Sequence, residues 1–382
     1  MKRVSLHLVA GIVFSLLVAT RASAQVARVF LAGTGNDAGD CSNQATPCRS
    51  LQGTVNQCPV DGEIIILDNG GYGGATITKS LTVDASAGVV AFIARTITVT
   101  IGATDKVVLR GLSMNGVVFG DADGIAFTGG GTLVVENSIV AGFTTAGIDQ
   151  VAAGSNLIVN NCGFRNNSAG VLNSTFSDTN SNTVIENSRF EHNTAFGVDA
   201  EHGTTNVSIR NSVLANNFGG VYAFSASQTQ PVLIVVDTCT IAHNSSAGTD
   251  ADAVAAGIAT IRVTNSTVDH NTYGMFLNGA GAAIQSYGNN RVTANTNGRP
   301  SSAIGVYTIS KGGVHDTSLS PDCRRICFLF CRRYQRFGAG GPGLSHRNRK
   351  RRRRLYESGH TVSQPPGGGD GLPGQRRDHH PG

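Results

Sequence analysis

The sequence predicts an all-β solenoid, a fold in which one short unit of strands and turns repeats along an axis. The first observation is a five-residue skeleton that recurs at ENSIV 136–140, NNCGF 160–164, ENSRF 186–190, RNSVL 210–214, DTCTI 237–241, TNSTV 264–268 and GNNRV 288–292. The second positions of these segments are Asn137, Asn161, Asn187, Asn211, Thr238, Asn265 and Asn289, separated by 24, 26, 24, 27, 27 and 24 residues. An interval this steady indicates one supersecondary unit that stacks on its own copies.

The second observation is the alternation that precedes each of these reference positions. Two residues before them stand Val135, Val159, Ile185, Ile209, Val236, Val263 and Tyr287, and four residues before them stand Leu133, Leu157, Thr183, Val207, Ile234, Ile261 and Gln285. Three residues after them stand Val140, Phe164, Phe190, Leu214, Ile241, Val268 and Val292. A period of two with mostly β-branched residues predicts strands rather than helices.

Each repeat then contains turn residues. A second asparagine column lies six residues after the reference position, at Asn167, Asn193, Asn217, Asn244, Asn271 and Asn295, with Phe143 in the first repeat. Glycines follow at Gly147, Gly170, Gly197, Gly220, Gly274 and Gly298. Glycine permits positive φ and asparagine tolerates it, so we expect Asn-x-x-Gly to form a corner. Asparagines in the same corner of every coil predict a structural ladder of amide hydrogen bonds.

With short strands and tight corners every ~25 residues, the chain resembles the right-handed parallel β-helix proteins of the pectate-lyase-like superfamily over about residues 30–310. The resemblance implies a right-handed parallel β-helix, and about 250 residues at ~25 per coil predict about ten coils. Valine and isoleucine outnumber leucine at the apolar positions, which argues against leucine-rich repeats. The calcium-binding nonapeptide repeat and any long helical period are absent from the sequence.

The sequence divides into four segments. Residues 1–24 have the pattern of a secretory signal peptide, with Lys2 and Arg3 before an apolar run and Ala22-Ser23-Ala24 as a cleavage site. We expect an N-terminal cap at 25–62, with a short helix over 51–58, and the β-helix at 63–312. In an exported protein Cys41 and Cys48 are expected to form a disulfide, with Cys58 as a competing partner.

Residues 313–382 lose the repeat and are interpreted as a disordered basic tail, either out-of-frame translation or a diverged remnant. Residues 314–382 hold 14 basic and 5 acidic residues, whereas residues 25–313 hold 13 basic and 20 acidic residues, a net charge of −7. The solenoid therefore lacks the basic surface of a nucleic-acid-binding protein. We expect a secreted or periplasmic monomer with no membrane span, no cofactor and no metal, and with polysaccharide as its partner.

Candidate chemistry was sought among side chains that face outward in register. Two residues after the corner glycines stand Asp149, Leu172, Asp199, Tyr222 and Phe276, and two residues further on stand Glu201 and Phe224. Asp149 and Asp199 would lie two coils apart, ~9.6 Å at ~4.8 Å per rung. An inverting glycosidase pair is ~6.5–9.5 Å apart. Asp149, Asp199 and Glu201 are thus candidate catalytic residues, with Tyr222, Phe224 and Phe276 as candidate substrate-binding residues.

Other patterns favour structure over chemistry. The acids Asp149 and Asp199 also suit a soluble surface that resists edge pairing. Asp121-Ala-Asp123-Gly124-Ile125 is similar to an acidic motif of polygalacturonases, but the further motifs of that family and the calcium and arginine motifs of pectate lyases are missing. His192, His243 and His270 share a column that stacked polar turn residues explain. The sequence therefore favours a surface, structural or carbohydrate-binding protein, and the alternative is a polysaccharide hydrolase or lyase.

Overall fold

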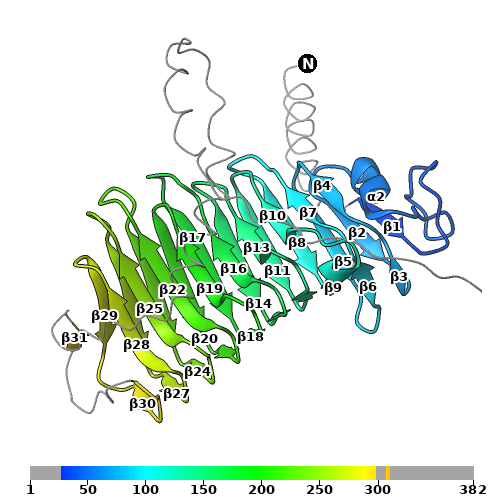
Figure 1. Ribbon diagram of the computed structural model, residues 1–382. Coiled ribbons are helices and arrows are strands. Elements are labelled where there is room, and N and C mark those ends of the chain that lie inside the picture. The colour runs from blue at the N-terminus through cyan, green and yellow to red at the C-terminus, as the bar shows by residue number, and fades with distance from the viewer. Residues whose placement is uncertain (1–26, 298–306, 310–382) are drawn as a thin grey trace, which may run out of the picture. The chain divides into compact units, whose positions relative to one another are not determined.

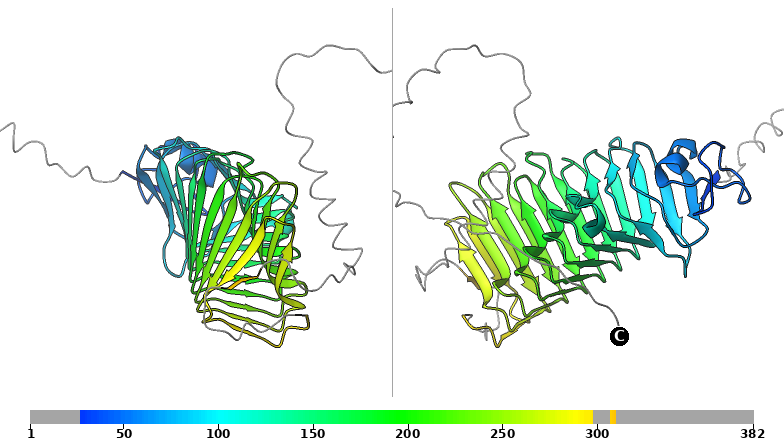
Figure 2. Two further views of the ribbon diagram at one scale, coloured as in Figure 1. Left: turned by 90° about the vertical axis from the view of Figure 1, so that its left-hand side faces the viewer. Right: turned by 45° about the vertical axis from the view of Figure 1, so that its right-hand side comes forward.

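Figure 1 shows the computed structural model of the protein, which describes residues 27–297 and 307–309. The strands form three sheets, here called A, B and C, and the chain passes from A to B to C in each coil. The signal segment at 1–24 and the basic tail at 313–382 lie outside the described residues. Successive coils stack along the solenoid from the blue N-terminal part to the yellow C-terminal part (Figure 2).

Sheet A has twelve strands in the described part of the chain, in the order β1-β2-β5-β8-β11-β14-β17-β20-β23-β26-β29-β31. They are β1 Arg28–Leu31, β2 Gly62–Ile66, β5 Leu81–Ala85, β8 Lys106–Arg110, β11 Thr132–Glu136, β14 Asn156–Asn160, β17 Ser181–Glu186, β20 Thr205–Arg210, β23 Val232–Asp237, β26 Ala259–Thr264, β29 Ala282–Ser286 and β31 Tyr307–Ile309. The pairing is parallel throughout, except that β31 pairs antiparallel with β29.

Sheet B has ten described strands. They are β3 Gly70–Gly71, β6 Ala91–Ile93, β9 Leu112–Asn115, β12 Ile139–Ala141, β15 Gly163–Arg165, β18 Arg189–Glu191, β21 Val213–Ala215, β24 Thr240–Ala242, β27 Thr267–Asp269 and β30 Arg291–Thr293. A single 3-10 turn at Gly116–Val118 follows β9. Because each coil contributes one strand to sheet B, these ten strands are close to the expected number of about ten coils.

Sheet C has nine described strands. They are β4 Ala75–Ile77, β7 Ile97–Val99, β10 Asp123–Phe127, β13 Ala146–Gln150, β16 Ala169–Asn173, β19 Phe196–Glu201, β22 Gly219–Ser225, β25 Ala247–Ala253 and β28 Tyr273–Asn278. All of these strands pair in parallel, each with the strand about one repeat away in the sequence.

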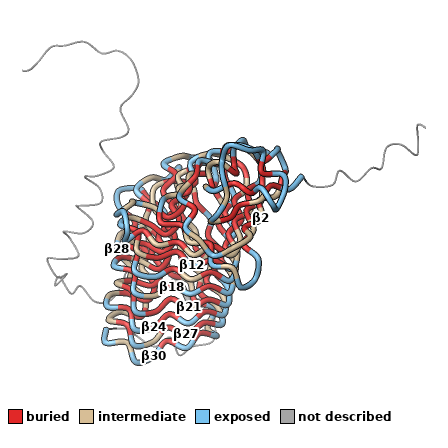
Figure 3. The backbone as a smooth tube through the Cα atoms, turned by 90° about the vertical axis from the view of Figure 1, so that its right-hand side faces the viewer, coloured by how far each residue is buried: buried red, intermediate tan, exposed pale blue. Residues whose placement is uncertain are grey.

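The core runs through the middle of the coils (Figure 3). The residues at the alternating positions predicted to be apolar, such as Leu133 and Val135, are buried in the coils from β11 to β26. In β29 the prediction is wrong by one residue: Ile284 and Ser286 pair with Ile261 and Val263, and Tyr287 is therefore exposed. Val135 pairs with Val159 of the next coil, so the same column position repeats from rung to rung. The hydrophobic effect therefore acts on a continuous apolar column, because each coil covers the open side of its neighbour.

A ladder of buried asparagine amides stands at the corner between sheets B and C. The side-chain oxygen of Asn217 accepts from the backbone and side-chain nitrogens of Asn193, at 3.0 and 2.9 Å. Asn217 in turn donates to the side-chain oxygen of Asn244 and to the carbonyl of Phe190. The ladder continues through Asn167 at one end and Asn295 at the other. Phe143 replaces the amide in its coil, yet its N–H still donates to Asn167.

The reason for the corner glycines differs from the expectation. Gly147, Gly170, Gly197 and Gly220 are not among the residues with positive φ. Instead, a Cβ atom added to any of them would lie only 2.4–2.9 Å from the carbonyl oxygen of the column glycine in the next coil. These positions require glycine because the backbones approach closely. The left-handed residues are the ones immediately before the ladder, including Asn166 and His192.

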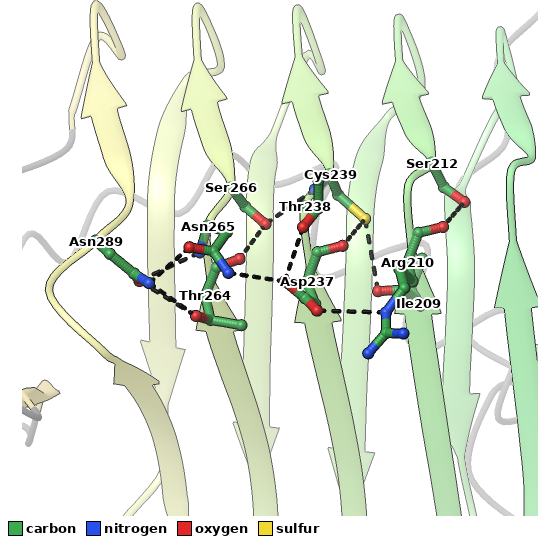
Figure 4. Close-up of polar contacts among 10 residues, drawn as sticks. All are labelled: Ile209, Arg210, Ser212, Asp237, Thr238, Cys239, Thr264, Asn265, Ser266 and Asn289. Atoms are coloured by element: carbon green, nitrogen blue, oxygen red, sulfur yellow. Dashed lines mark hydrogen bonds and ion pairs between the residues drawn. The ribbon is translucent and has the colours of Figure 1, made fainter.

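The corner between sheets A and B uses the reference positions (Figure 4). Asn137, Asn161, Asn187, Asn211, Thr238 and Asn265 all adopt left-handed φ between 48° and 56°. Polar side chains link the corners of neighbouring coils: Asn289 donates to Asn265 at 2.8 Å, and Asn265 donates to Asp237 at 3.2 Å. The residues that follow these corner positions by one, such as Cys239 and Ser266, form a buried column. In this column the Ser266 hydroxyl accepts a hydrogen bond from the N–H of Cys239.

The N-terminal end is closed by a helix and a disulfide loop. Helix α2, Leu51–Gln57, begins at Ser50, whose hydroxyl accepts from the N–H of Gly53. Cys41 and Cys48 form the predicted disulfide, and Cys58 is a free, buried thiol. Leu51 and Val55 bury one side of the helix against the first coils. This arrangement covers the edge at which sheet pairing would otherwise continue.

The amide ladder generates a stability prediction. Asn217→Ala removes a buried amide and leaves the polar groups of Asn193 and Phe190 without their partner. We expect the free energy of unfolding to fall by about 1–3 kcal/mol. Chemical denaturation monitored by circular dichroism measures this change. Asn206→Ala, at an exposed position of sheet A, is the control, and equal stability of the two variants would contradict a structural role for the ladder.

Candidate functional site

Sheet C brings the candidate acids into one column. Asp149 pairs with Leu172, and Leu172 pairs with Asp199 in the next coil. Asp199 pairs with Tyr222, and Tyr222 with Asp250. The column therefore alternates carboxylate with apolar or aromatic residues, one per rung, and its carboxylates recur every second rung, ~9.6 Å apart.

Asp250 is a residue that the sequence reasoning missed. It follows Gly248 by two residues, as Asp149 follows Gly147, so the same spacing rule identifies it. Gly248 also occupies the crowded corner position, because an added Cβ would lie 2.9 Å from the carbonyl of Gly274. Phe276 pairs with Asp250 and ends the column in the described residues.

A second column lies two residues further along the same strands and therefore on the same face. Glu201 pairs with Phe224, Phe224 with Asp252, and Asp252 with Asn278. Asp252 accepts hydrogen bonds from Asn278, at 3.0 Å, and from the hydroxyl of Tyr222, at 3.4 Å. The two columns thus contact each other through Tyr222 and Asp252.

The candidate acids are more buried than expected. Asp149 is 3% exposed and Asp199 is 9% exposed, whereas the sequence suggested open surface positions. Tyr222 is also buried, and Glu201, Phe224 and Phe276 are half-buried. Strand alternation predicts the face on which a residue lies but not its burial, which depends on the side chains and loops packed around it.

Hydrogen bonding divides the carboxylates into two groups. Asp149 accepts from the hydroxyl of Ser174 at 3.2 Å. One carboxylate oxygen of Asp199 and one of Asp250 are buried with no hydrogen-bond partner among the described residues. Such orphaned buried oxygens are costly, and in native proteins they usually mark a functional requirement.

Burial and mutual repulsion raise the pKa values of these acids. Loss of solvation, followed by the charges of Glu201, Asp250 and Asp149, raises the pKa of Asp199 well above its ordinary value. Burial, followed by the charge of Asp252, raises the pKa of Asp250 to about 8. Burial, followed by the charge of Asp149, raises the pKa of Glu201 to about 7. Perturbed pKa values of this kind are frequent at binding and catalytic sites.

A run of aromatic rings borders the two columns. Phe176 stacks on His202 with ring centroids 4.6 Å apart, and His202 meets Phe224 edge-on at 5.0 Å. Phe224 lies 6.3 Å from Tyr222, and Tyr222 stacks on Phe196 at 4.4 Å. Burial lowers the pKa of His202, which favours the neutral ring. The sequence reasoning missed Phe176, Phe196 and His202.

Two of these rings come from strained loops. Phe176 and His202 follow β16 and β19 and have φ of 48° and 55°, in the left-handed region that a phenylalanine rarely adopts. The N–H of Phe176 donates to the carbonyl of His202, which holds the loops of adjacent coils together. In the sequence, Phe176 stands three residues beyond β16 and His202 directly follows β19, so an aromatic or histidine side chain soon after these strands is the signal that identifies them. Strain at such positions is frequent at functional sites.

We call these residues the acid–aromatic face. It comprises Asp149, Asp199, Glu201, Asp250 and Asp252 with Phe176, Phe196, His202, Tyr222, Phe224 and Phe276. The nine strands of sheet C contain no lysine or arginine. The face can therefore offer stacking surfaces, hydrogen-bond acceptors and protonated carboxyl donors to a ligand.

The remaining candidates lie elsewhere. His192, His243 and His270 occupy the left-handed corner position, and the rings of His243 and His270 stack at 4.9 Å. Asp121 pairs with Arg95, and Asp123 lies in β10, where burial raises its pKa to about 7. In the part of the chain that the structure describes, no three His, Cys, Asp or Glu side chains gather as a metal site. Within the same residues, no helix is long and apolar enough to cross a membrane.

The raised pKa values predict how stability depends on pH. Asp250 has a pKa of about 8 in the folded state against an ordinary value of 3.8, so its stabilising contribution is present at low pH and is lost as pH rises through 8. We expect Tm to be ~2 °C or more higher at about pH 5 than at about pH 8.5, measured by calorimetry.

Asp250→Asn should reduce this difference, because asparagine does not ionise. Asp61→Asn, at an exposed left-handed position, is the matched control and should leave the pH dependence unchanged. A Tm that rises between these two pH values in the parent protein would contradict the assignment.

The chain is similar to known proteins in its fold. The family model described as "Right handed beta helix region" matches residues 64–233 and 173–297. Similar solved structures include the pectate lyase Pel9A, at 14% identity over 78% of this chain and 86% of that chain, with a TM-score of 0.46. Another is the Dettilon tailspike protein (gp208), at 10% identity over 66% of this chain and 62% of that chain, with a TM-score of 0.34.

No curated protein matches the chain. The two family matches together span residues 64–297, which is more than half of the 382 residues. The matched segment contains the reference corners, the amide ladder and the whole acid–aromatic face. The chain belongs to the right-handed β-helix family.

Proposed function

We propose that this protein is an exported β-helix protein that binds polysaccharide on its acid–aromatic face. The observation that carries the proposal is the run of rings from Phe176 through His202, Phe224 and Tyr222 to Phe196, which borders two columns of carboxylates. Sugar rings present apolar C–H faces that stack on aromatic side chains, and their hydroxyls donate to carboxylates. A ligand that repeats along its length suits a face that repeats along the solenoid.

Export is supported by the disulfide and by the first residues of the chain. Cys41 and Cys48 are bonded, and such bonds persist mainly in oxidising compartments. The signal pattern at 1–24 agrees with that location. The proposed organisation is a cap at 25–62, the β-helix at 63–312 and a basic tail at 313–382.

A second candidate is a polysaccharide-active hydrolase or lyase, and the raised pKa values are the observation that favours it. For a hydrolase, Asp199, whose pKa burial raises well above its ordinary value, would donate its proton to the leaving oxygen of a glycosidic bond. Asp149, two rungs away on the same face, would accept the proton of an attacking water. The separation of ~9.6 Å lies at the upper limit of the range for inverting enzymes.

Binding is tested with a glycan array followed by titration of the best ligand against the Phe224→Ala variant. Loss of the central ring of the run should weaken binding ~10-fold, which corresponds to about 1.4 kcal/mol. Tyr287→Ala is the control, because Tyr287 is an exposed aromatic residue beyond β29 of sheet A. Equal affinity of the Phe224→Ala variant and the parent would place binding on another surface.

Catalysis is tested by release of reducing sugar from the glycans that bind, together with absorbance for unsaturated products of a lyase. Asp199→Asn keeps the size of the side chain and removes its proton transfer, so hydrolysis should fall at least ~100-fold while Tm is retained or raised. Asp61→Asn is again the control. Hydrolysis that survives Asp199→Asn assigns the acid to another residue, and the absence of any release in the parent leaves the protein as a binding module.

A further inference from the structure

The charge of the acid–aromatic face restricts the class of glycan that it suits, and this step rests on the proposed function. Six acidic residues lie on the strands of sheet C, namely Asp123, Asp149, Asp199, Glu201, Asp250 and Asp252. No lysine or arginine lies on these nine strands, or between Asp121 and Gly131, or on the loops at 151–155, 174–180, 202–204, 226–231 and 254–258. A polymer of sugar acids would meet like charges along these strands and loops.

The positions of the acids suit a cationic chain instead. Asp149, Asp199 and Asp250 recur at every second rung, with Leu172 and Tyr222 between them. In a β-1,4-linked glycan, successive rings are turned by half a revolution, so equivalent groups of every second sugar point to the same side. A chain laid along the solenoid would present one substituent of each second sugar to a carboxylate and the ring between them to an apolar side chain.

The orphaned oxygens on Asp199 and Asp250 supply an independent observation. Asp199 is 9% exposed, and its Oδ1 has no hydrogen-bond partner within the described residues. The charged groups that act on it are Glu201, Asp250 and Asp149, all acidic, and the strands of sheet C carry no lysine or arginine. A buried carboxylate of this kind gains most from a ligand that brings both a positive charge and an N–H donor.

We propose that the acid–aromatic face binds an amine-bearing polysaccharide, one in which deacetylated amino sugars present ammonium groups to Asp199 and Asp250. Tyr222 lies between these two carboxylates in the first column, and Phe224 lies between Glu201 and Asp252 in the second column on the same face. Aromatic faces attract ammonium groups as well as sugar C–H groups. Each ammonium group would thus contact a carboxylate and an aromatic side chain, while the neighbouring sugar ring stacks on an aromatic or apolar side chain.

Calorimetric titration of the full-length protein near pH 6.5 tests this proposal. The probes are a fully N-deacetylated chito-oligosaccharide hexamer, its N-acetylated counterpart and an oligogalacturonide of the same length. We expect the deacetylated hexamer to bind at least ~10-fold more tightly than the acetylated one, and the oligogalacturonide to bind more weakly than either. The affinity of the deacetylated hexamer should fall with added salt, since salt screens the attraction between its ammonium groups and the carboxylates.

Two further readouts separate charge recognition from simple stacking. Binding of the deacetylated hexamer should release protons, because an ammonium group lowers the raised pKa values of Asp199 and Asp250. Heats measured in buffers of different ionisation enthalpy quantify this release. Asp199→Asn and Asp250→Asn should each weaken the hexamer at least ~5-fold and reduce the proton release, whereas Asp61→Asn should change neither.

The outcomes distinguish this inference from the proposed function. Equal affinity for the acetylated and deacetylated hexamers, or a preference for the oligogalacturonide, would overturn the amine specificity and leave polysaccharide binding intact. Tighter binding of hexalysine than of the deacetylated hexamer would show recognition of charge without sugar and would also overturn it. Failure of the deacetylated hexamer to bind would overturn the inference, whereas the proposed function would be overturned only if no glycan of the array binds.

Discussion

The requirement that every coil match the next at ~4.8 Å is the constraint on which the rest of the structure depends. The buried amide ladder from Asn167 to Asn295 satisfies it with directional bonds, because each amide oxygen accepts from the preceding coil and each amide nitrogen donates to the next. The glycines beside it allow the backbones to approach, since an added Cβ would meet the next carbonyl. Because the asparagine and glycine columns fix how each coil sits on the next, side chains at equivalent positions of successive coils also stand in register.

This register explains why the acid–aromatic face exists as a surface and not as scattered residues. Asp149, Asp199 and Asp250 are about fifty residues apart in sequence, yet each follows its crowded glycine by two residues and so stands in one column. The same regularity that orders them also brings their charges together. The fold therefore tolerates carboxyl groups at Asp199 and Asp250 whose pKa values are raised by burial and by neighbouring charges, which is an arrangement that ligand binding can relieve.

Regularity also limits what the fold says about function. The ladder, the apolar columns and the left-handed corners would serve any right-handed β-helix, whatever it binds. Function has to be carried by what departs from the repeat, and here the departures cluster. Phe176 and His202 lie on loops of adjacent coils in strained backbone, and their stacked rings extend the aromatic run beyond the strands. The orphaned oxygens of Asp199 and Asp250 lie beside the same run.

The sequence by itself determined the repeat, the strands, the asparagine ladder and the register of Asp149 with Asp199, because these follow from local periodicity and spacing. It favoured the Cys41–Cys48 bond but left Cys58 as a competing partner, which the structure shows as a free thiol. It also held the spacing that identifies Asp250. Only the tertiary structure decided that the acids are shielded, that the corner glycines serve close backbone approach rather than positive φ, and that Phe176 meets His202. These depend on distances between coils, which the order of residues along one coil does not contain.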